Sequence, residues 1–287
     1  MRITFLGTGS AMPTGERFQT GLLLESGSPA GDERGDGPSN RLLVDCGAGV
    51  LQRLARTAVG YEGVSTVLLT HHHLDHVADL LPLLKARWLA GEEHLEVVGP
   101  RGTGALLDGL LGVHEYLQDR IDLRVREVGA ESFSLAGFAV EARETRHSMD
   151  CLAYRFTRQG DGESNDRGTG GANDDAAKSD DGDPSAFTFS GDSEAFEGLA
   201  RFADGSAVLA HDCSFPDAVD VSNHPTPSQL GRTLADSGTD VGRVYLTHLY
   251  PHTEGRHEEM LESVGENYDG DVRFARDGLT IEVGQPA

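Results

Sequence analysis

Apolar residues occur along the chain in two patterns that alternate from one end to the other. Short apolar runs bounded by glycine, proline or acidic residues predict buried strands, whereas apolar positions three or four apart predict helices. Runs of the first kind lie at 2–6, 20–25, 41–45, 67–69, 96–98, 123–128, 132–135, 140–144, 151–157, 187–189, 206–210 and 244–247, and two short ones end the chain. Helical spacing occurs at 49–59, 80–88, 102–111, 194–202, 228–237 and 256–268. This mixture predicts an α/β fold.

One stretch of the first half is echoed in the second. Residues 64–71 and 241–248 align as an apolar strand that ends in Leu-Thr and is followed directly by a histidine, His71 or His248. An approximate internal duplication indicates two halves of similar construction. We therefore expect two mixed β-sheets packed face to face, with helices outside.

Two segments interrupt the alternation because they contain almost no apolar residues. Segments 26–40 and 159–184 consist mainly of Gly, Ser, Pro, Asn and acidic residues. Such a composition cannot bury enough apolar surface to offset its ordering entropy, which predicts disorder. For a chain of 287 residues, we expect one domain spanning 1–287 with these two acidic insertions.

The charge of the chain is strongly negative, with 47 acidic residues against 24 basic ones and a net charge of −23. This balance normally argues against a polyanionic partner. An acidic chain with only two lysines also resembles halophilic proteins, and in concentrated salt the Debye length falls to about 3 Å. Repulsion of a nucleic acid would then be screened, so the charge does not decide the substrate.

Three cysteines, Cys46, Cys151 and Cys213, are widely spaced and odd in number. They predict reduced thiols in the core and a cytoplasmic protein. No apolar run approaches the ~20 residues that a membrane helix needs, and the first residues lead into a strand rather than a signal peptide. We therefore expect no membrane association.

The segment His71-His72-His73-Leu74-Asp75-His76 carries the strongest chemical signal. It lies between a predicted core strand and a helix, where a turn can aim several side chains at one place. Alternate residues share a side of the turn, so His71 and His73 can reach one metal ion, and Asp75 and His76 a second. Imidazole and carboxylate donors at this density suit zinc. The alternative, a solvated histidine-rich loop, does not account for so many ionisable residues at a strand end.

A site for two metal ions needs further donors, and these should lie at other strand ends. His147, Asp192 and His248 each follow a predicted strand. A carboxylate such as Asp192 can bridge two metal ions roughly 3.5–4 Å apart. Taken singly, Asp192 could instead cap a helix, and a lone histidine is usually no ligand.

At this point the chain resembles the metallo-β-lactamase fold hydrolases, and among them the ribonuclease Z-like branch. The resemblance covers nearly the whole chain outside the two acidic segments. Its motifs are Phe5-Leu6-Gly7-Thr8-Gly9 with Pro13 and Arg17, Leu43-Val44-Asp45-Cys46-Gly47, the histidine segment, His147, Gly191-Asp192, His211-Asp212-Cys213-Ser214-Phe215, His224 in Asn-His-Pro-Thr, and Leu246-Thr247-His248. It implies an αββα metallo-β-lactamase-type sandwich with two Zn2+ ions per chain, and it leaves a homodimer open.

The resemblance also implies roles for individual residues. His71, His73 and His147 would bind one zinc ion, Asp75, His76 and His248 the second, and Asp192 would bridge them. Asp45 would hold the histidine turn from behind, although a turn cap is an alternative. His224 would contact the scissile phosphate or protonate the leaving oxygen, oriented by Asp212 or His211. A hydroxide shared by the metal ions would be the nucleophile, and Asp75 could take its proton.

The sequence thus predicts a dinuclear zinc phosphodiesterase that acts on RNA ends or on small or cyclic phosphodiesters. Alternatives are a transfer-RNA 3′ processing endoribonuclease, a lactone or thioester hydrolase on the same metals, and a non-catalytic metal-binding protein. Two departures from the branch stand out. Asp79 replaces a usual glycine, and the acidic segment 159–184 lies where processing enzymes carry a basic arm. We therefore expect slow or absent cleavage of precursor transfer RNA.

Overall fold

The computed structural model describes residues 1–27, 40–159, 185–219 and 221–284. The segments predicted to be disordered, 26–40 and 159–184, lie almost wholly outside these ranges. At the base of the first segment, the Ser26 N–H donates to the Asn40 carbonyl at 2.9 Å. The single-domain organisation with two insertions stays a prediction.

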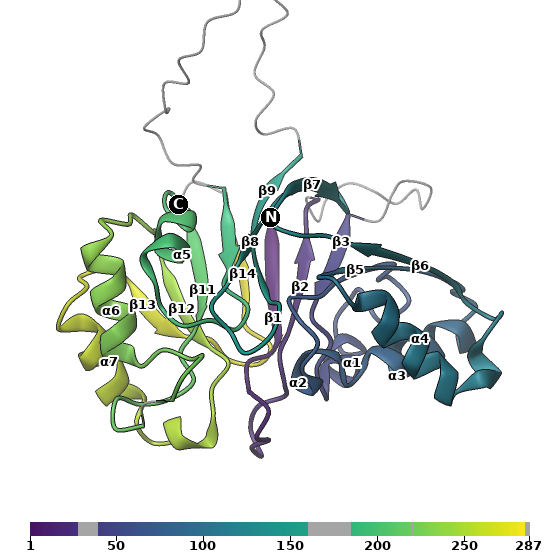
Figure 1. The fold of residues 1–287 in the computed structure, drawn as a ribbon, viewed down its shortest axis with the longest axis horizontal. Coiled ribbons are helices and arrows are strands. Elements are labelled where there is room, and N and C mark those ends of the chain that lie inside the picture. Colours follow the sequence, from purple (N-terminus) through teal and green to yellow (C-terminus); the bar gives the residue numbers. More distant parts are fainter. Residues whose placement is uncertain (28–39, 160–184, 220, 285–287) are drawn as a thin grey trace, which may run out of the picture.

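Two seven-stranded sheets form the centre of the molecule (Figure 1). The first has the order β14-β1-β2-β3-β4-β5-β6 and the second the order β13-β12-β11-β10-β9-β8-β7. The strands of the first sheet are β1 (Arg2–Gly7), β2 (Gly21–Glu25), β3 (Arg41–Val44), β4 (Thr66–Leu68), β5 (His94–Gly99), β6 (Asp122–Glu127) and β14 (Thr280–Glu282). Those of the second are β7 (Ser132–Leu135), β8 (Phe138–Glu144), β9 (Leu152–Arg158), β10 (Phe187–Phe189), β11 (Val208–Asp212), β12 (Val244–Thr247) and β13 (Val272–Phe274).

The two sheets are built alike, which explains the internal echo in the sequence. Each has an antiparallel part, β14-β1-β2-β3 or β7-β8-β9-β10, and a parallel part, β3-β4-β5-β6 or β10-β11-β12-β13. The echoed strands β4 and β12 lie in the parallel parts. Each is followed by one of the two histidines, His71 or His248.

Three apolar layers hold the sandwich together. Phe5, Phe156 and Phe187 belong to the core between the sheets, and two further cores lie between each sheet and its helices. In β2, Leu22 and Leu24 face the central core while Leu23 faces the helices, because successive side chains alternate across a strand. Strands buried on both faces read as continuous apolar runs. The predicted two-sheet sandwich is confirmed.

The helices cover the outer faces of the sheets (Figure 1). They are α1 (Val50–Leu54), α2 (Leu74–Val77), α3 (Leu80–Leu89), α4 (Thr103–Val113), α5 (Glu197–Phe202), α6 (Pro227–Asp236) and α7 (His257–Gly265), with the 3-10 turns η1 (Glu115–Leu117) and η2 (Pro251–Thr253). No helix in the described ranges is long and apolar enough to cross a bilayer.

Some predicted helix bounds were wrong. The helix predicted at 49–59 already ends at Leu54, where the Thr57 hydroxyl donates to the Leu54 carbonyl and Gly60 takes a left-handed backbone conformation. The helix predicted from 194 begins at Glu197, after an extended Phe196. The one-turn helix α2, which carries Asp75 and His76, was not predicted.

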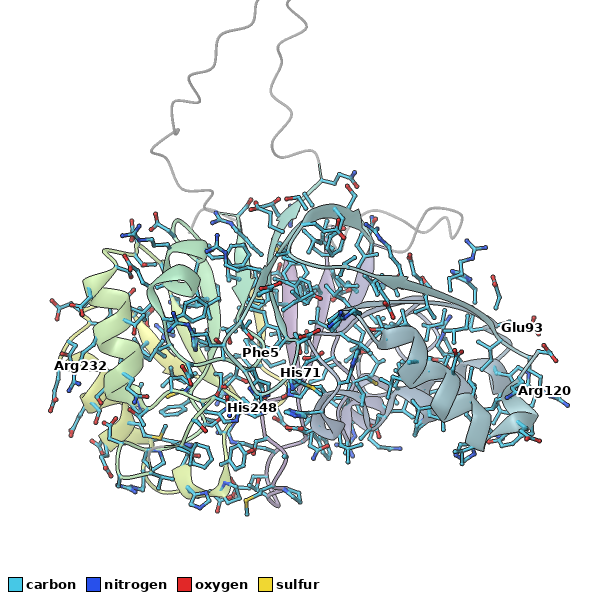
Figure 2. All side chains as sticks on the ribbon, in the orientation of Figure 1. Phe5, His71, Glu93, Arg120, Arg232 and His248 are labelled. Carbon is cyan, nitrogen blue, oxygen red and sulfur yellow. The ribbon has the colours of Figure 1, made fainter. Side chains whose placement is uncertain are left out.

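Segments of the two sheets meet at one edge of the sandwich. Gly9, after β1, forms a parallel bridge with Leu249, after β12. The Leu152 N–H at the start of β9 donates to the Thr70 carbonyl after β4, at 3.0 Å. Figure 2 shows His71 and His248 close together at this edge, below Phe5. The two halves therefore bring their strand-end histidines to a common place.

Candidate metal centre

The first group of donors consists of His71, His73, His147 and Asp192. One atom of each lies within 4.8 Å of the others. The Nδ1 atom of His73 is 3.1 Å from His71 Nε2 and 3.1 Å from His147 Nε2. Asp192 Oδ2 lies 3.6 Å from His71 Nε2 and 3.8 Å from His147 Nε2. These residues come from both sheets, because His71 follows β4, His147 follows β8 and Asp192 follows β10.

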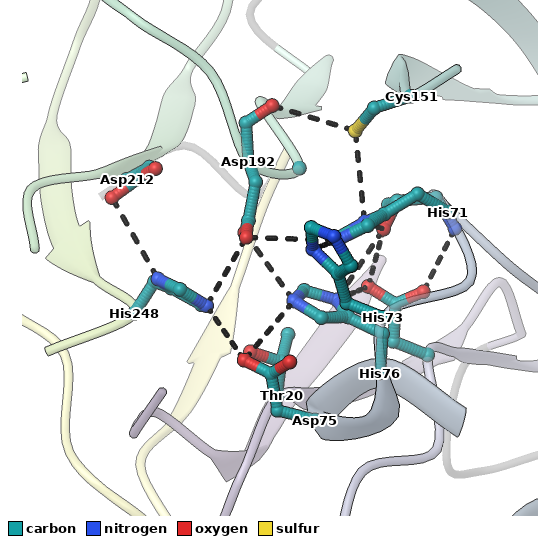
Figure 3. A network of polar contacts seen from close by, with 12 residues as sticks. Thr20, His71, His73, Asp75, His76, Cys151, Asp192, Asp212 and His248 are labelled. Atoms are coloured by element: carbon teal, nitrogen blue, oxygen red, sulfur yellow. Dashed lines mark hydrogen bonds and ion pairs between the residues drawn. The ribbon is translucent and has the colours of Figure 1, made fainter. Parts of the chain in front are cut away.

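The second group consists of Asp75, His76 and His248, and Asp192 borders it as well (Figure 3). His248 Nε2 lies 3.1 Å from Asp75 Oδ2 and 3.2 Å from Asp192 Oδ2. His76 Nε2 lies 3.3 Å from Asp192 Oδ1. The structure thus brings all seven predicted ligands together, with Asp192 between the two groups.

The donor set fits metal ions for two reasons. Three imidazole nitrogens of the first group face one another, and each such contact requires a proton or a cation between two lone pairs. In addition, His76 Nε2 is buried, makes no well-aligned hydrogen bond and faces carboxylate oxygens of Asp192 and Asp75 at 3.3 and 3.8 Å, a setting that favours a cation between them. Imidazole and carboxylate donors in this number are the ligands zinc prefers.

Asp45 holds the histidine turn from behind. Its Oδ2 atom lies 2.7 Å from His76 Nδ1, and its two oxygens accept the N–H and the hydroxyl of Thr70, each at 2.8 Å. The bond from His76 Nδ1 leaves Nε2 of that ring facing the donor groups. Asp45 itself has a positive φ of 58°, a conformation that costs energy in a residue other than glycine and is found at functional sites.

Ser214 links the second group to His224, a connection that the sequence did not predict. Its Oγ atom donates to Asp212 Oδ1 at 2.6 Å and lies 2.9 Å from His248 Nδ1. The other oxygen of Asp212, Oδ2, is 2.7 Å from His224 Nδ1. The His224 ring stacks on that of His248, with centroids 5.4 Å apart.

The contact of Thr70, whose Oγ1 atom is 3.0 Å from His71 Nδ1, was also not predicted. Both hydroxyls, those of Ser214 and Thr70, lie within segments that the sequence analysis singled out, but only the folded chain shows which rings they reach.

His211, the other predicted partner of His224, has a different environment. It is buried in β11, and its Nδ1 donates to the Asp212 carbonyl at 2.7 Å. The residue that contacts His224 is therefore Asp212.

Asp79, the departure from the branch, also has a structural role. Its Oδ2 accepts the backbone N–H groups of Gly49 and Leu51 at 2.8 and 3.0 Å. This carboxylate therefore holds the first turn of α1 against the histidine segment. The three cysteines are free and buried, as predicted.

Burial sets the protonation of two of the rings in the first group. It lowers the pKa of His71 well below the ordinary value of 6.5, and the charge of His76 lowers it further. Burial also lowers the pKa of His147. Both rings are therefore neutral at pH 7, as metal ligands must be.

Acidic neighbours favour the protonated form of the histidines in the second group. Burial favours the neutral ring, but the charges of Asp192 and Asp45 overcome it and raise the pKa of His76 well above the ordinary value. For His248, burial is likewise outweighed by Asp192 and by the bond to Asp75, which raise its pKa. A metal ion bound here must displace these protons.

His224 combines partial burial with a charged partner. Burial alone would lower the pKa of the ring, but the charge and hydrogen bond of Asp212 raise it to about 9. The ring is thus a cation at neutral pH and lies beside the donor groups. It can attract an anionic substrate or deliver a proton.

A cavity of about 620 Å³ lies beside His147, which is one of its lining residues. Its walls include Arg101, Met149 and Asp150, and Arg101 lies 3.3 Å from Asp150. The cavity gives a substrate room next to the first group of donors.

Comparison with known proteins identifies the sequence relationships of the chain. A family model described as the β-lactamase superfamily domain matches residues 40–249. Curated relatives named ribonuclease Z match over nearly their whole length. The protein from Methanopyrus kandleri is 31% identical, with 97% of this chain and 96% of the relative covered. Those from Mycobacterium avium and Haloferax volcanii are 29% and 28% identical, over 100% and 99% of this chain and 100% and 95% of theirs.

Solved structures share the fold at lower identity. The metallo-β-lactamase fold protein YhfI from Bacillus subtilis superposes with a TM-score of 0.72 at 23% identity, covering 98% of this chain and 99% of its own. The short form of human tRNase Z gives a TM-score of 0.68 at 20% identity, covering 99% and 100%. A diphosphatase of the PhnP family gives 0.62 at 18% identity, covering 98% and 97%.

Proposed function

Since the chain belongs to the metallo-β-lactamase superfamily of metal-dependent hydrolases, and there to the ribonuclease Z-like branch, we propose that it is a dinuclear zinc phosphodiesterase. The observation that carries the proposal is the position of Asp192 between two groups of donors, with the His224 cation beside the second. His71, His73 and His147 would hold one zinc ion and Asp75, His76 and His248 the other, with Asp192 between them. Zinc ions bound there would supply a hydroxide nucleophile at neutral pH and polarise the phosphoryl oxygens.

The residues of the chain that do not bind metal favour a phosphodiester over a neutral ester. The His224 cation can pair with a phosphoryl oxygen that carries negative charge, and it can give its proton to the leaving oxygen. Asp212 holds the ring with Nδ1 occupied, so that Nε2 is the atom that acts on the substrate. A lactone or thioester carries no charge for this cation to bind, which makes lactone or thioester hydrolysis the less suitable reaction.

Two substrate classes remain within this reaction. Small or cyclic phosphodiesters need only the metal centre and the neighbouring cavity, and they are our first choice. Processing of transfer-RNA 3′ ends is the second, supported by the full-length relatives named ribonuclease Z. We place the activity in the cytoplasm, where three free thiols remain reduced, and we leave a homodimer as part of the proposal.

A hydrolysis panel tests the function. Zinc-loaded protein is offered bis-nitrophenyl phosphate, cyclic nucleotides, precursor transfer RNA and a lactone, and zinc is counted by elemental analysis. We expect two zinc ions per chain and turnover of the phosphodiesters, both lost in Asp192→Asn. Less than one equivalent of zinc, or turnover of the lactone alone, would reject the proposal. Zinc binding without any turnover would indicate a non-catalytic metal-binding protein.

A further inference from the structure

Three aromatic rings form a small surface beside the metal centre, which we call the aromatic shelf: Phe215, Tyr250 and His252. Phe215 and Tyr250 are stacked, with centroids 4.4 Å apart and an angle of 27° between the rings. The His252 ring lies 5.4 Å from Phe215 and 6.5 Å from Tyr250. Phe215 is buried, Tyr250 is half-buried and His252 is exposed. The shelf therefore has a fixed inner ring and accessible outer ones.

The shelf is continuous with the residues of the metal centre. The His224 ring lies 6.0 Å from both Phe215 and Tyr250, and the Tyr250 ring lies 5.8 Å from that of His248. In sequence, Phe215 is three residues after Asp212 and Tyr250 two residues after His248. A group bound on the shelf would thus be separated from a substrate phosphate at the metal centre only by the ring of His224 or His248.

Backbone hydrogen bonds fix the position of the shelf. The Tyr250 N–H donates to the Ser214 carbonyl at 3.2 Å, which joins the two segments that carry Phe215 and Tyr250. The Thr253 hydroxyl and N–H donate to the Tyr250 carbonyl at 2.8 and 3.0 Å, closing the turn η2 around His252. A surface fixed in this way loses little conformational entropy when a flat ligand binds.

We infer that the aromatic shelf stacks the base of a nucleotide whose phosphodiester lies at the metal centre. The inference rests on the proposed function and names the substrate class more closely: a diester with a nucleoside on the arm that does not leave. Every base has a π-face, and such stacking is strong enough to change affinity by about tenfold or more for each base.

The net charge of the chain also favours binding a nucleotide by stacking of its base over binding it by cationic contacts to its phosphate. The chain carries a net charge of −23 and has two lysines, so phosphate contacts to lysine can contribute little. Lys85, the lysine within the described ranges, lies over the rings of Trp88 and Tyr116. Contacts to phosphate also weaken as salt rises, whereas stacking of neutral rings needs no counterion release. A shelf of aromatic rings therefore suits nucleotide binding by an acidic protein.

The test compares ligands that differ in the base, for binding, or in the whole nucleoside, for turnover. For binding, zinc-loaded protein is titrated calorimetrically with thymidine 5′-monophosphate and with 2-deoxyribose 5-phosphate. For turnover, thymidine 5′-(4-nitrophenyl phosphate) is compared with methyl 4-nitrophenyl phosphate, which has the same leaving group. The variants are Tyr250→Ala, Tyr250→Phe, which keeps the ring, and Tyr116→Ala, which removes an exposed tyrosine of η1.

We expect the base to improve both affinity and kcat/KM about tenfold or more in the wild type. Tyr250→Ala should abolish this advantage mainly through Kd and KM, while Tyr250→Phe and Tyr116→Ala should keep it. The inference would be overturned if the wild type showed equal affinity and equal kcat/KM for the two members of each pair. It would also be overturned if Tyr250→Ala kept the higher affinity and kcat/KM for the ligands that carry the base. If no diester is hydrolysed, the proposed function fails, and the binding pair still decides whether the shelf accepts a base.

Discussion

The Nδ1 atom of His224 lies 2.7 Å from Oδ2 of Asp212, and the ring stacks on His248. This pair joins the buried carboxylate of Asp212 to the His224 cation at the edge of the metal centre. Neither residue belongs to the first donor group. It allows acid–base chemistry to be separated from metal binding by mutation.

His224→Ala is expected to lower kcat by about 100- to 10,000-fold, the usual contribution of a positioned proton donor. Zinc content, measured by elemental analysis, should stay at the wild-type value. His94→Ala is the matched control, because His94 also pairs with an aspartate, Asp122, but at the surface. A parallel loss of zinc in His224→Ala would show that His224 is itself a ligand, as its place in a group with Asp192, Asp212 and His248 allows.

The pH profile should report the same ring. Because Asp212 raises the pKa of His224 to about 9, the ring is protonated below that pH and loses its proton above it. If His224 acts as the acid, kcat should be level while the ring is protonated and fall as pH rises through the pKa of the ring. Asp212→Asn removes the charge that raises the pKa, so the falling limb should move to lower pH. A limb that does not move would assign the titration to another group.

Asp45→Asn tests the support of the histidine turn. The variant weakens the acceptor for His76 Nδ1, and loss of such a partner usually costs 10- to 100-fold in metal affinity. We expect a loss of about that size in chelator competition at neutral pH. Asp122→Asn, which alters the surface pair with His94, should bind zinc like the wild type. Equal affinity of Asp45→Asn and wild type would make Asp45 a turn cap only.

Gly47→Ala tests how closely β3 and the histidine turn pack. A Cβ atom at this position would lie 2.1 Å from the Asp75 carbonyl oxygen, so the ligand-bearing turn must shift. We expect a loss of about 1–3 kcal/mol in the free energy of unfolding of the metal-free protein, typical of overpacking, together with weaker zinc binding. Gly129→Ala, where a Cβ meets nothing within 4 Å, is the control. Urea titration followed by circular dichroism measures the free energy of unfolding of both variants, and chelator competition measures their zinc affinity.

The sequence predicted those features that depend on local pattern. A buried strand followed by histidine places His71 and His248 at strand ends. The contacts between the two sheets, such as the bridge from Gly9 to Leu249, bring these ends to one edge. Contacts between distant segments were missed, and so were some local helix ends. Ser214 and Thr70 are ordinary hydroxyl residues until the fold sets them against Asp212 and Asp45, and the contact between Phe215 and Tyr250 joins segments 35 residues apart. The end of α1 was missed for a different, local reason: the Thr57 hydroxyl and N–H both turn back to the Leu54 carbonyl, although the apolar spacing continues.

The last prediction concerns transfer RNA. Affinity for a processing substrate should come from Lys and Arg contacts to phosphates away from the metals, and three candidate arginines already have other partners. Arg87 is buried and donates to the carbonyls of Tyr61, Glu62 and His94. Arg101 and Arg124 lie near Asp150 and Asp122, at 3.3 and 3.6 Å. In segment 159–184, outside the described ranges, Arg167 and Lys178 are outnumbered by acidic residues.

Raising the salt concentration does not restore attraction between the protein and RNA phosphates. High salt screens the repulsion between an acidic protein and RNA, but it equally weakens contacts to phosphate, because counterion release becomes less favourable. We therefore expect kcat/KM for precursor transfer RNA to stay below that for a thymidine phosphodiester at low and at high salt, in assays that follow 3′ trailer release on gels. Efficient, site-specific trailer release by the purified protein would contradict this. Arginine-to-alanine variants at Arg101, Arg120 and Arg124 would then locate the RNA contact, with Arg87 excluded by its burial.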